Sequence, residues 1–399
     1  MTEQIRVGII APCPPPYGGM TRVVENHLAN WKSDEVASYF IPMYPPVESV
    51  GLEGSEFIRL ADGYDRNWAG LGSYLKILPR IPLARPWVYR HFMNYNQALS
   101  ELIRRERLDL IYAHEIWPAG ASAVLQTRIH GIPSVVVAYG ECYGTTPEHQ
   151  RWKRIGSSVV QEATHLIATS EHCLNGALAL GRAGSAADVV YAGVDLDRFN
   201  PSVDGSEWRH ERGIPPEAIV VSVLGMVLRN KLDTFLDAVG QIDSKAPVVC
   251  LIGGAGGDEE YVRTRSADIK NTHVEMLGFV PEEELPEFYA ATDILVASPR
   301  TLLECMGQSM KEAMACGTVV VGARLGGIPE AVECGETGLL YEADDALDLA
   351  RAISQLADDK AARDRMGAAG RIRAEIHFNS TTSAEQTLSI FRQVVSAAR

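Results

Sequence analysis

The stretch from Ile294 to Gly317 limits the fold of this chain more than any other, because it joins an apolar run to a helical pattern through a short loop. The run Ile294–Ala297 has no polar alternation, which is typical of a parallel strand buried on both faces. Apolar side chains then recur at helical spacing from Gln308 to Cys316, and Gly317 supplies the glycine that commonly ends a helix. Strand, loop and helix in this order predict an α/β fold.

Two glutamates flank the start of that predicted helix. Glu304 lies in the loop, and Glu312 lies inside the helix, eight positions later. Met306 and Gly307 fall where the helix begins, so the backbone there offers unpaired N–H groups and the positive end of the helix dipole. A carboxylate beside such a position suits a substrate that carries both a phosphate and sugar hydroxyl groups. Two acids taken alone are more commonly a surface loop residue and a solvated helix residue.

A longer order of motifs surrounds these glutamates. After Glu304 and Glu312 come the sequence A-M-A-C-G, an apolar run, the sequence G-G-I-P-E and the sequence G-E-T-G-L-L, at 313–317, 319–321, 326–330 and 335–340. This order resembles the signature region of the retaining glycosyltransferases of family 4, which have the GT-B fold. The resemblance is specific here and extends more weakly over nearly the whole chain. It implies that Glu304 contacts the donor sugar and that Glu312 binds the ribose of the nucleotide.

Chain length favours two domains, since 399 residues exceed what one ordinary hydrophobic core contains. The resemblance implies two Rossmann-like, doubly wound domains with an interdomain cleft. We predict an N-terminal acceptor-binding domain from residues 1–201, completed by a helix at 381–399 that crosses back to it. Residues 202–380 are the predicted nucleotide-sugar-binding domain, and polar residues 202–212 are the predicted linker.

Charge and cysteine content argue against several classes of function. The formal net charge of −14 disfavours a nucleic-acid partner, because phosphate backbones bind basic surfaces. Seven cysteines without CxxC spacing predict free thiols in a reducing, cytoplasmic compartment and no zinc site. No apolar run approaches the roughly 18 residues that suggest a transmembrane helix. The short acidic N-terminus leads straight into a strand, so no signal peptide is expected.

Loops of the N-terminal half contain further candidate site residues. Gly18 and Gly19 match paired glycines of the family, whose backbone lies close to the donor phosphates and the acceptor; a simple tight turn explains them equally well. His114 follows an apolar strand, where open α/β sheets bind ligands, and matches a family histidine near the substrates. Tyr139 stands where the family commonly has a histidine that contacts the donor sugar. Tyrosine can donate a hydrogen bond but has no proton switch near neutral pH, so Glu141 is a candidate to take part instead.

The second domain is expected to bind the donor diphosphate with cations, as the resemblance implies. Lys231 is in register with the family lysine, but Met226 occupies the position of the family arginine. Arg229 is close enough along the loop to replace that arginine and stabilise charge on the leaving group. Otherwise the site has one cation fewer and altered catalysis. The backbone near Val280 is expected to contact the nucleobase.

Residues 72–92 belong to the least family-like part of the chain and mix aromatic, aliphatic and basic side chains. This composition suits a weak peripheral contact with a membrane surface, or an acceptor cleft. A helix pair packed on its own domain is the commoner structure for such a segment, with its basic side chains reaching into water. The acidic net charge also favours that second interpretation.

The resemblance implies a hexosyltransferase-class enzyme that moves a sugar from a nucleotide diphosphate sugar, expected to be a UDP-sugar, to an acceptor hydroxyl with retention. It implies no metal or other cofactor, because cations and a helix dipole stabilise the leaving diphosphate. The acceptor stays open among a saccharide, a lipid-linked saccharide and a natural-product scaffold, and so does the oligomeric state. Met226 and Tyr139 keep a second interpretation open, a pseudo-glycosyltransferase or nucleotide-binding protein with altered catalysis. A membrane-surface binding protein is the third.

Overall fold

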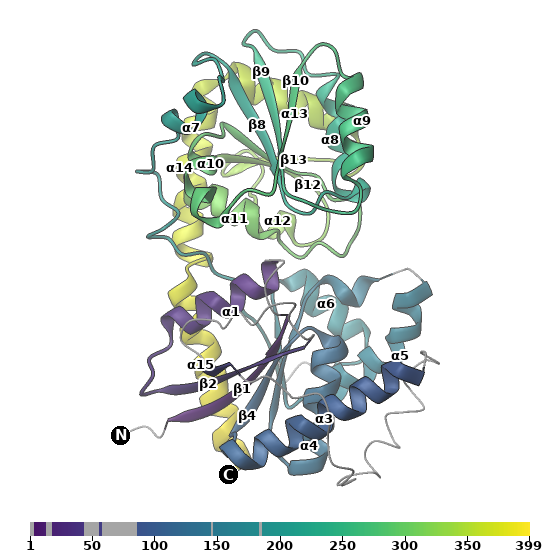
Figure 1. The fold of residues 1–399 in the computed structure, drawn as a ribbon. Helices are drawn as coiled ribbons and strands as arrows, with labels where there is room; N and C mark the ends of the chain where they lie inside the picture. Colours follow the sequence, from purple (N-terminus) through teal and green to yellow (C-terminus); the bar gives the residue numbers. More distant parts are fainter. Residues whose placement is uncertain (1–3, 13–17, 44–55, 58–85, 145–146, 183–185) are drawn as a thin grey trace. The chain divides into compact units, whose positions relative to one another are not determined.

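Two compact units make up the protein in a computed structural model that describes residues 4–12, 18–43, 56–57, 86–144, 147–182 and 186–399 (Figure 1). The first unit is formed by Met1–Gly193 together with Ser380–Arg399, and the second by Val194–Asn379. Each unit has its own parallel sheet covered by helices. The α/β fold predicted from the strand, loop and helix at 294–317 is therefore confirmed in both halves of the chain.

The first unit is built on a parallel sheet in the order β3-β2-β1-β4-β5-β6-β7. Its strands are β1 (Ile5–Ala11), β2 (Val36–Pro42), β3 (Glu56–Phe57), β4 (Leu110–His114), β5 (Ser134–Ala138), β6 (His165–Ala168) and β7 (Ala187–Val189). The central strands are almost wholly apolar, because helices cover both faces of the sheet. The strand order reverses between β1 and β4, and sheets of this class bind ligands at such a switch point.

Helices cover each face of the first sheet. One face carries α1 (Gly19–Asn30) and α15 (Ser380–Ala398), and the other carries α3 (Pro86–Glu106), α4 (Ala121–His130) and α5 (Pro147–Glu162) (Figure 1). The remaining helix is α6 (Glu171–Ala179), with shorter helical turns at Ile116–Gly120 and Gly140–Tyr143. Each face has its own cluster of buried apolar side chains.

Helix α15 returns from the end of the chain to complete the first unit. The indole Nε1 of Trp31 donates a hydrogen bond to the carbonyl oxygen of Ala384 at 3.0 Å. The fully buried ring of Phe391 lies 5.4 Å from the Trp31 ring and 5.0 Å from the Tyr112 ring, between centroids. These contacts confirm that the last helix crosses back to the N-terminal domain.

The second unit is built on a parallel sheet in the order β10-β9-β8-β11-β12-β13. Its strands are β8 (Ile219–Leu224), β9 (Val248–Gly253), β10 (His273–Gly278), β11 (Ile294–Ala297), β12 (Val319–Ala323) and β13 (Gly338–Tyr341). The switch point lies between β8 and β11, so the loops that follow these two strands are where a ligand is expected. The predicted strand at 294–297 is β11.

Helices of the second unit also lie in two groups. Helix α8 (Arg229–Val239) packs with α9 (Glu259–Asp268) and α13 (Ala346–Asp358), and α11 (Gln308–Ala315) packs with α10 (Leu285–Ala290) and α14 (Lys360–His377) (Figure 1). Shorter helices are α7 (Ser206–Glu211), α12 (Ile328–Ala331) and a turn at Glu282–Glu284. Helix α11 is the helix that the sequence predicts after Gly307.

The two units divide between Gly193 and Val194, whereas the sequence placed the boundary after residue 201. Hydrogen bonds explain the difference, because they join this segment to the second unit. The N–H of Val194 donates to the carbonyl oxygen of Phe378 at 2.7 Å. The guanidinium of Arg371, on α14, donates to the carbonyl oxygen of Phe199 at 2.7 Å.

The predicted linker at 202–212 is likewise part of the second unit. Most of it forms the short helix α7, whose buried Trp208 ring packs on Phe288 with centroids 5.7 Å apart. Arg209, also on α7, pairs with the carboxylate of Asp293 at 2.8 Å. The polar composition of this segment predicted a linker, but the segment instead forms an amphipathic helix that buries one tryptophan.

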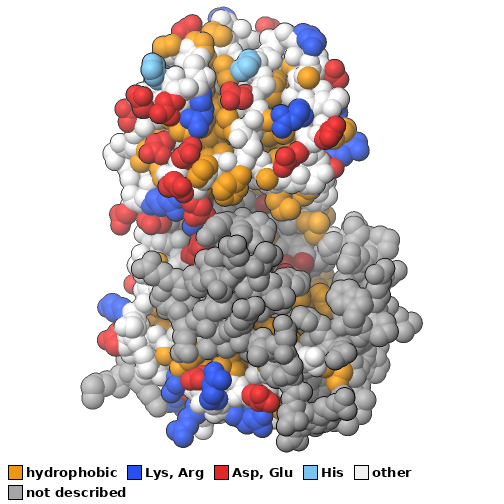
Figure 2. Space-filling model, viewed as in Figure 1, with side chains coloured by type: hydrophobic (Ala, Val, Ile, Leu, Met, Phe, Trp, Pro, Cys, Tyr) orange, Lys and Arg blue, Asp and Glu red, His pale blue; other side chains and the backbone are white. Residues whose placement is uncertain are grey.

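Charged side chains of both signs are mixed on the visible surface of the second unit (Figure 2). Lys360 and Asp364, on α14 of the second unit, form an exposed ion pair, with Nζ 2.7 Å from a carboxylate oxygen. Exposed pairs of this kind contribute little to stability, because water and salt screen them. The stability of the unit therefore depends mainly on its apolar core.

In the described ranges, no helix is long and apolar enough to cross a membrane. The six cysteines within those ranges are free thiols. Of the segment 72–92, residues 72–85 lie outside the described residues, and α3 begins at Pro86. The membrane contact and the cytoplasmic location stay predictions.

Phe391→Ala should destabilise the protein by about 3–5 kcal/mol, because it leaves a cavity in a core that relaxes only partly. Gln393→Ala is the matched control, since Gln393 lies on the same helix and is exposed. Denaturant unfolding of both variants measures the difference. An equal, small effect of the two substitutions would show that α15 is not part of the core of the first unit.

Candidate active site

Two loops meet at the switch point of the second sheet. One follows β8 and leads into α8, and the other follows β11 and leads into α11. They bring together Lys231 and Glu304, with Nζ 3.0 Å from Oε2. The side chain of Lys231 is 37% exposed and that of Glu304 is 18% exposed, so the pair is open to a ligand. Both residues were predicted as site residues, and the structure places them in direct contact.

Glu304 is held in place by its own loop and by a neighbouring one. Its Oε1 accepts a hydrogen bond from the N–H of Gly307 at 3.0 Å. Its carbonyl oxygen accepts one from Gly327 at 3.3 Å. Gly326 has a φ of +60° and passes so close that a Cβ there would lie 2.2 Å from the same carbonyl oxygen. Only glycine fits this approach, so Gly326 fixes the loop that presents the carboxylate.

Helix α11 begins directly after Gly307, whose φ is +41°. Glycine offers no capping side chain, and the first turn of α11 contains no acidic residue. The start of the helix therefore combines backbone N–H groups with the positive end of the dipole. Met306 is 2% exposed, so its predicted part in donor binding is limited to its backbone.

Glu312 lies on α11 and is only 5% exposed. Its Oε2 accepts a hydrogen bond from the hydroxyl of Tyr289 at 2.7 Å. Tyr289 comes from α10 and is fully buried. Glu312 is therefore not a solvated helix acid, and its contact with the ribose stays a prediction.

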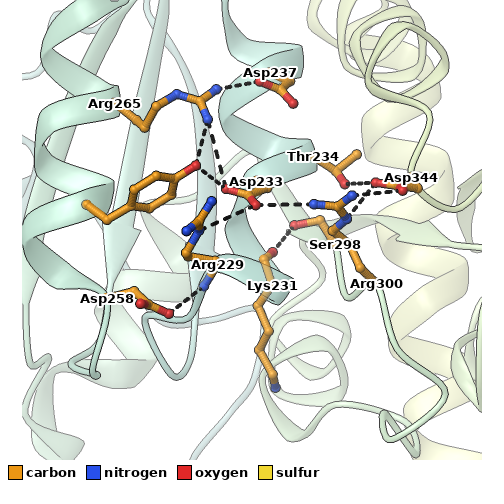
Figure 3. A network of polar contacts seen from close by, with 11 residues as sticks. Arg229, Lys231, Asp233, Thr234, Asp237, Asp258, Arg265, Ser298, Arg300 and Asp344 are labelled. Atoms are coloured by element: carbon orange, nitrogen blue, oxygen red, sulfur yellow. Dashed lines mark hydrogen bonds and ion pairs between the residues drawn. The ribbon is translucent and has the colours of Figure 1, made fainter. Parts of the chain in front are cut away.

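Arg229 begins α8 but points away from Lys231 (Figure 3). Its guanidinium carbon lies 4.0 Å from the centroid of the Tyr261 ring, and its Nε lies 4.0 Å from the carboxylate of Asp233. The structure thus does not bring Arg229 to the Lys231–Glu304 pair, contrary to the expectation that it replaces the arginine missing at Met226. The difference arises because an aromatic face and a carboxylate on the outer side of α8 compete for the guanidinium.

The loop around Met226 is pinned against the glycine turn that follows β9. The N–H of Gly225 donates to the carbonyl oxygen of Gly253 at 3.1 Å. Gly254 has a φ of +124°, and a Cβ there would lie 1.8 Å from the carbonyl oxygen of Gly225. The side chain of Met226 is 60% exposed. The backbone before Met226 is thus fixed by the glycine turn, while the Met226 side chain itself is exposed.

Val280 follows the neighbouring strand β10. Its side chain is 8% exposed, and a Cβ on Gly253 would lie 3.0 Å from it. Because the side chain packs inward, only the backbone of Val280 can face a ligand. This placement is compatible with the expected backbone contact to a nucleobase, which stays a prediction.

In the first unit, the end of β4 places His114 against Tyr139. Nδ1 of the fully buried imidazole lies 2.8 Å from the tyrosine hydroxyl. Burial, and then the neighbouring His27, hold the pKa of His114 well below its usual range, so the ring is neutral. Its Nε2 has no hydrogen-bond partner among the described residues. The structure therefore brings two predicted site residues together in the first unit as well.

Glu141 joins the loops that follow β4 and β5. One carboxylate oxygen accepts the N–H of Ile116 at 2.9 Å, and the other accepts the N–H of Tyr139 at 2.8 Å. Burial raises the pKa of Glu141, and these backbone bonds oppose that rise. The carboxyl group thus orients the backbone that carries Tyr139.

Glu115 is a residue that the sequence pattern did not single out. Its φ is 82° and its ψ is 154°, a region that essentially only glycine adopts without strain. Its carboxyl group has no hydrogen-bond partner among the described residues. Burial, and then repulsion from Glu141, raise the pKa of Glu115 to about 9. Strain and a perturbed acid at a strand end are common at functional positions. The signal in the sequence was only a pair of titratable residues, His114 and Glu115, after an apolar run.

Gly18 precedes α1 and Gly19 begins it, after residues 13–17, which lie outside the described ranges. A Cβ on Gly18 would meet no atom within 4 Å, and its φ is −126°. Neither space nor conformation therefore requires glycine at this position in the described part of the chain. The proposed role of the paired glycines stays a prediction.

Both units of the chain match glycosyltransferase family models. Residues 17–198 match the model of Glycosyltransferase Family 4, and residues 204–373 match that of Glycosyl transferases group 1. The D-inositol 3-phosphate glycosyltransferase of Thermobifida fusca is 31% identical over 301 residues, which cover 70% of this chain and 67% of that protein. The chain belongs to glycosyltransferase family 4.

Two further similarities extend over nearly the full length of this glycosyltransferase. The N-acetyl-alpha-D-glucosaminyl L-malate synthase of Bacillus anthracis is 26% identical over 385 residues, or 89% of this chain and 96% of that protein. The structure of Anabaena HepE in complex with UDP and glucose has a TM-score of 0.75 at 20% identity and covers 98% of this chain and 100% of that one. The fold is therefore GT-B.

Glu115→Gln should stabilise the glycosyltransferase more as the pH rises. The pKa of Glu115 is about 9 in the folded state, against an ordinary value of 4.5. Between these values the unfolded chain loses a proton that the folded state keeps, so the wild type loses stability with increasing pH. Glutamine keeps the shape without the charge. Thermal unfolding should show a gap between the two proteins that widens from about pH 5 to about pH 9; a constant gap would contradict this.

Proposed function

We propose that this glycosyltransferase moves a sugar from a UDP-sugar to an acceptor hydroxyl with retention of configuration and without a metal ion. The observation that carries the proposal is the Lys231–Glu304 pair, which lies at the start of α11 and at the switch point of the second sheet. A cation and a helix dipole both favour an anionic ligand there. HepE, which shares the fold, was solved with UDP and glucose.

In the proposed reaction, the bond between the sugar and the diphosphate breaks while the acceptor oxygen bonds to the same carbon. The acceptor proton passes to an oxygen of the leaving diphosphate on the same face, so no covalent enzyme intermediate is needed. Negative charge grows on the diphosphate as the bond breaks, and Lys231 and the start of α11 stabilise that charge. Lys231 has three N–H donors, so it can contact Glu304 and a phosphate oxygen together. Glu304 then orients the donor sugar through its hydroxyl groups.

The names of the relatives do not indicate one acceptor for this chain. One is named for inositol 3-phosphate and the other for L-malate, so members of this family differ in what they modify. His114 and Tyr139 in the first unit are the proposed contacts near the reacting groups. A neutral imidazole can accept a hydroxyl proton or donate one, according to its tautomer.

A second candidate function is nucleotide binding without efficient transfer. One observation favours it: Arg229 lies against Tyr261 and Asp233 instead of beside Lys231. A site with a single cation stabilises the leaving diphosphate less well than a site with two. Assays of transfer and hydrolysis with a panel of nucleotide sugars separate the two functions.

UDP should bind in preference to GDP and ADP in titration calorimetry. Glu312→Ala should weaken that binding by about 1–3 kcal/mol, because two ribose hydroxyls lose their acceptor. Tyr289→Phe is the matched control, since it removes the hydroxyl that donates to Glu312 but keeps the carboxylate, and it should leave binding nearly unchanged. Absence of binding by all three nucleotides would refute the proposed function.

Lys231→Met should lower turnover by roughly 10²–10³-fold, as loss of one preorganised charge-stabilising donor does. Arg229→Met should leave turnover close to wild type, because its guanidinium lies on the outer side of α8. Steady-state rates with a saturating donor measure both. An equal loss in the two variants would mean that Arg229 leaves Tyr261 and reaches the donor during the reaction.

A further inference from the structure

We propose that Arg300 is a positioning residue that holds the loop of Glu304 against the helix turn of Lys231 (Figure 3). Arg300 lies four positions before Glu304, in the loop after β11. The inference rests on the proposed function, because it assigns a role to a neighbour of the proposed donor site.

The guanidinium of Arg300 joins three elements of the second unit. Its Nε and Nη2 lie 2.6 and 2.9 Å from the two carboxylate oxygens of Asp344, in the turn between β13 and α13. Its Nη1 donates to the carboxylate of Asp233, on α8, at 3.2 Å. Asp233 lies two residues after Lys231. A planar fork that binds one carboxylate through two atoms and a second carboxylate through a third has a fixed orientation.

Two backbone contacts join the same pieces. The N–H of Arg300 donates to the carbonyl oxygen of Asn230 at 2.8 Å. The hydroxyl of Ser298 donates to the carbonyl oxygen of Lys231 at 2.6 Å. The loop of Glu304 is thus tied to the first turn of α8 at both ends of the short stretch from Ser298 to Arg300.

Asp233 is itself fixed from the far side of α8. The hydroxyl of Tyr261, on α9, donates to its Oδ1 at 2.9 Å, whereas Arg300 contacts Oδ2. Its side chain is 13% exposed. The carboxylate that receives Arg300 is therefore held by a packed pair of helices, which makes it a firm anchor.

Stability alone does not account well for this network. Arg300 is 36% exposed and Asp344 is 56% exposed, and exposed ion pairs add little to folding. The network matters more for the position of the site residues, because a displacement of a catalytic group by about 1 Å can lower a rate about 100-fold. The contacts of Arg300 with Asp233 and Asp344, which we call the clamp, therefore act chiefly on the relative position of Lys231 and Glu304.

Arg300→Met should lower kcat by about 10-fold to 100-fold through this misplacement, with little change in the melting temperature or in KM for the donor. Arg324→Met is the matched control. Arg324 pairs with Glu342 at 2.9 Å and is 47% exposed, and among the described residues it does not contact Lys231 or Glu304. Arg300→Lys should recover only part of the rate, because a point charge cannot hold both carboxylates in one plane.

A double-variant cycle separates positioning from a merely structural role. If Arg300 acts through Lys231, Lys231→Met should cost less in the Arg300→Met background than in the wild type. In the Arg324→Met background it should cost its full amount. Two outcomes would overturn the positioning role of Arg300 but leave the proposed function intact. One is full additivity of the Lys231→Met and Arg300→Met effects. The other is a normal kcat for Arg300→Met while Lys231→Met is damaging. If Lys231→Met and Glu304→Gln are both harmless, the proposed function itself fails.

Discussion

The ion pair between Lys231 and Glu304 depends on the order of strands in the second sheet. Because β8 and β11 are neighbours in that sheet yet far apart in sequence, the loops after them meet at one edge. A glycine with positive φ, Gly326, lets a third loop press on the backbone of Glu304. The carboxylate, the ammonium and the start of α11 are consequently fixed by the fold before any ligand arrives.

The two units carry contrasting chemistry at their switch points. In the second, a cation and a helix start favour anions. In the first, His114 is neutral, and the carboxyl groups of Glu115 and Glu141 have raised pKa values. Such groups suit hydrogen bonding to hydroxyls better than binding of a phosphate. This contrast fits a division in which one unit binds the donor diphosphate and the other binds hydroxyl-bearing groups.

Local sequence pattern predicted the strands and helices that carry the site, whereas tertiary contacts decided where several of its side chains point. Apolar runs and glycines located β11 and α11, and the resemblance to the family selected Glu304 and Lys231. Spacing along the chain could not show that Arg229 turns toward Tyr261, because that ring comes from another helix. Nor could it show the strained backbone of Glu115, which depends on how β4 ends against its neighbours. The boundary lies earlier than predicted because hydrogen bonds tie Val194 and Phe199 to the second unit, which sequence composition does not show.

Hydrogen exchange of backbone amides with and without UDP tests the central claim most directly. If the donor diphosphate binds at the start of α11, UDP should slow exchange in the segments 225–231 and 304–310, with smaller changes elsewhere. Tight binding of UDP without protection of either segment, or with protection confined to the first unit, would contradict the account.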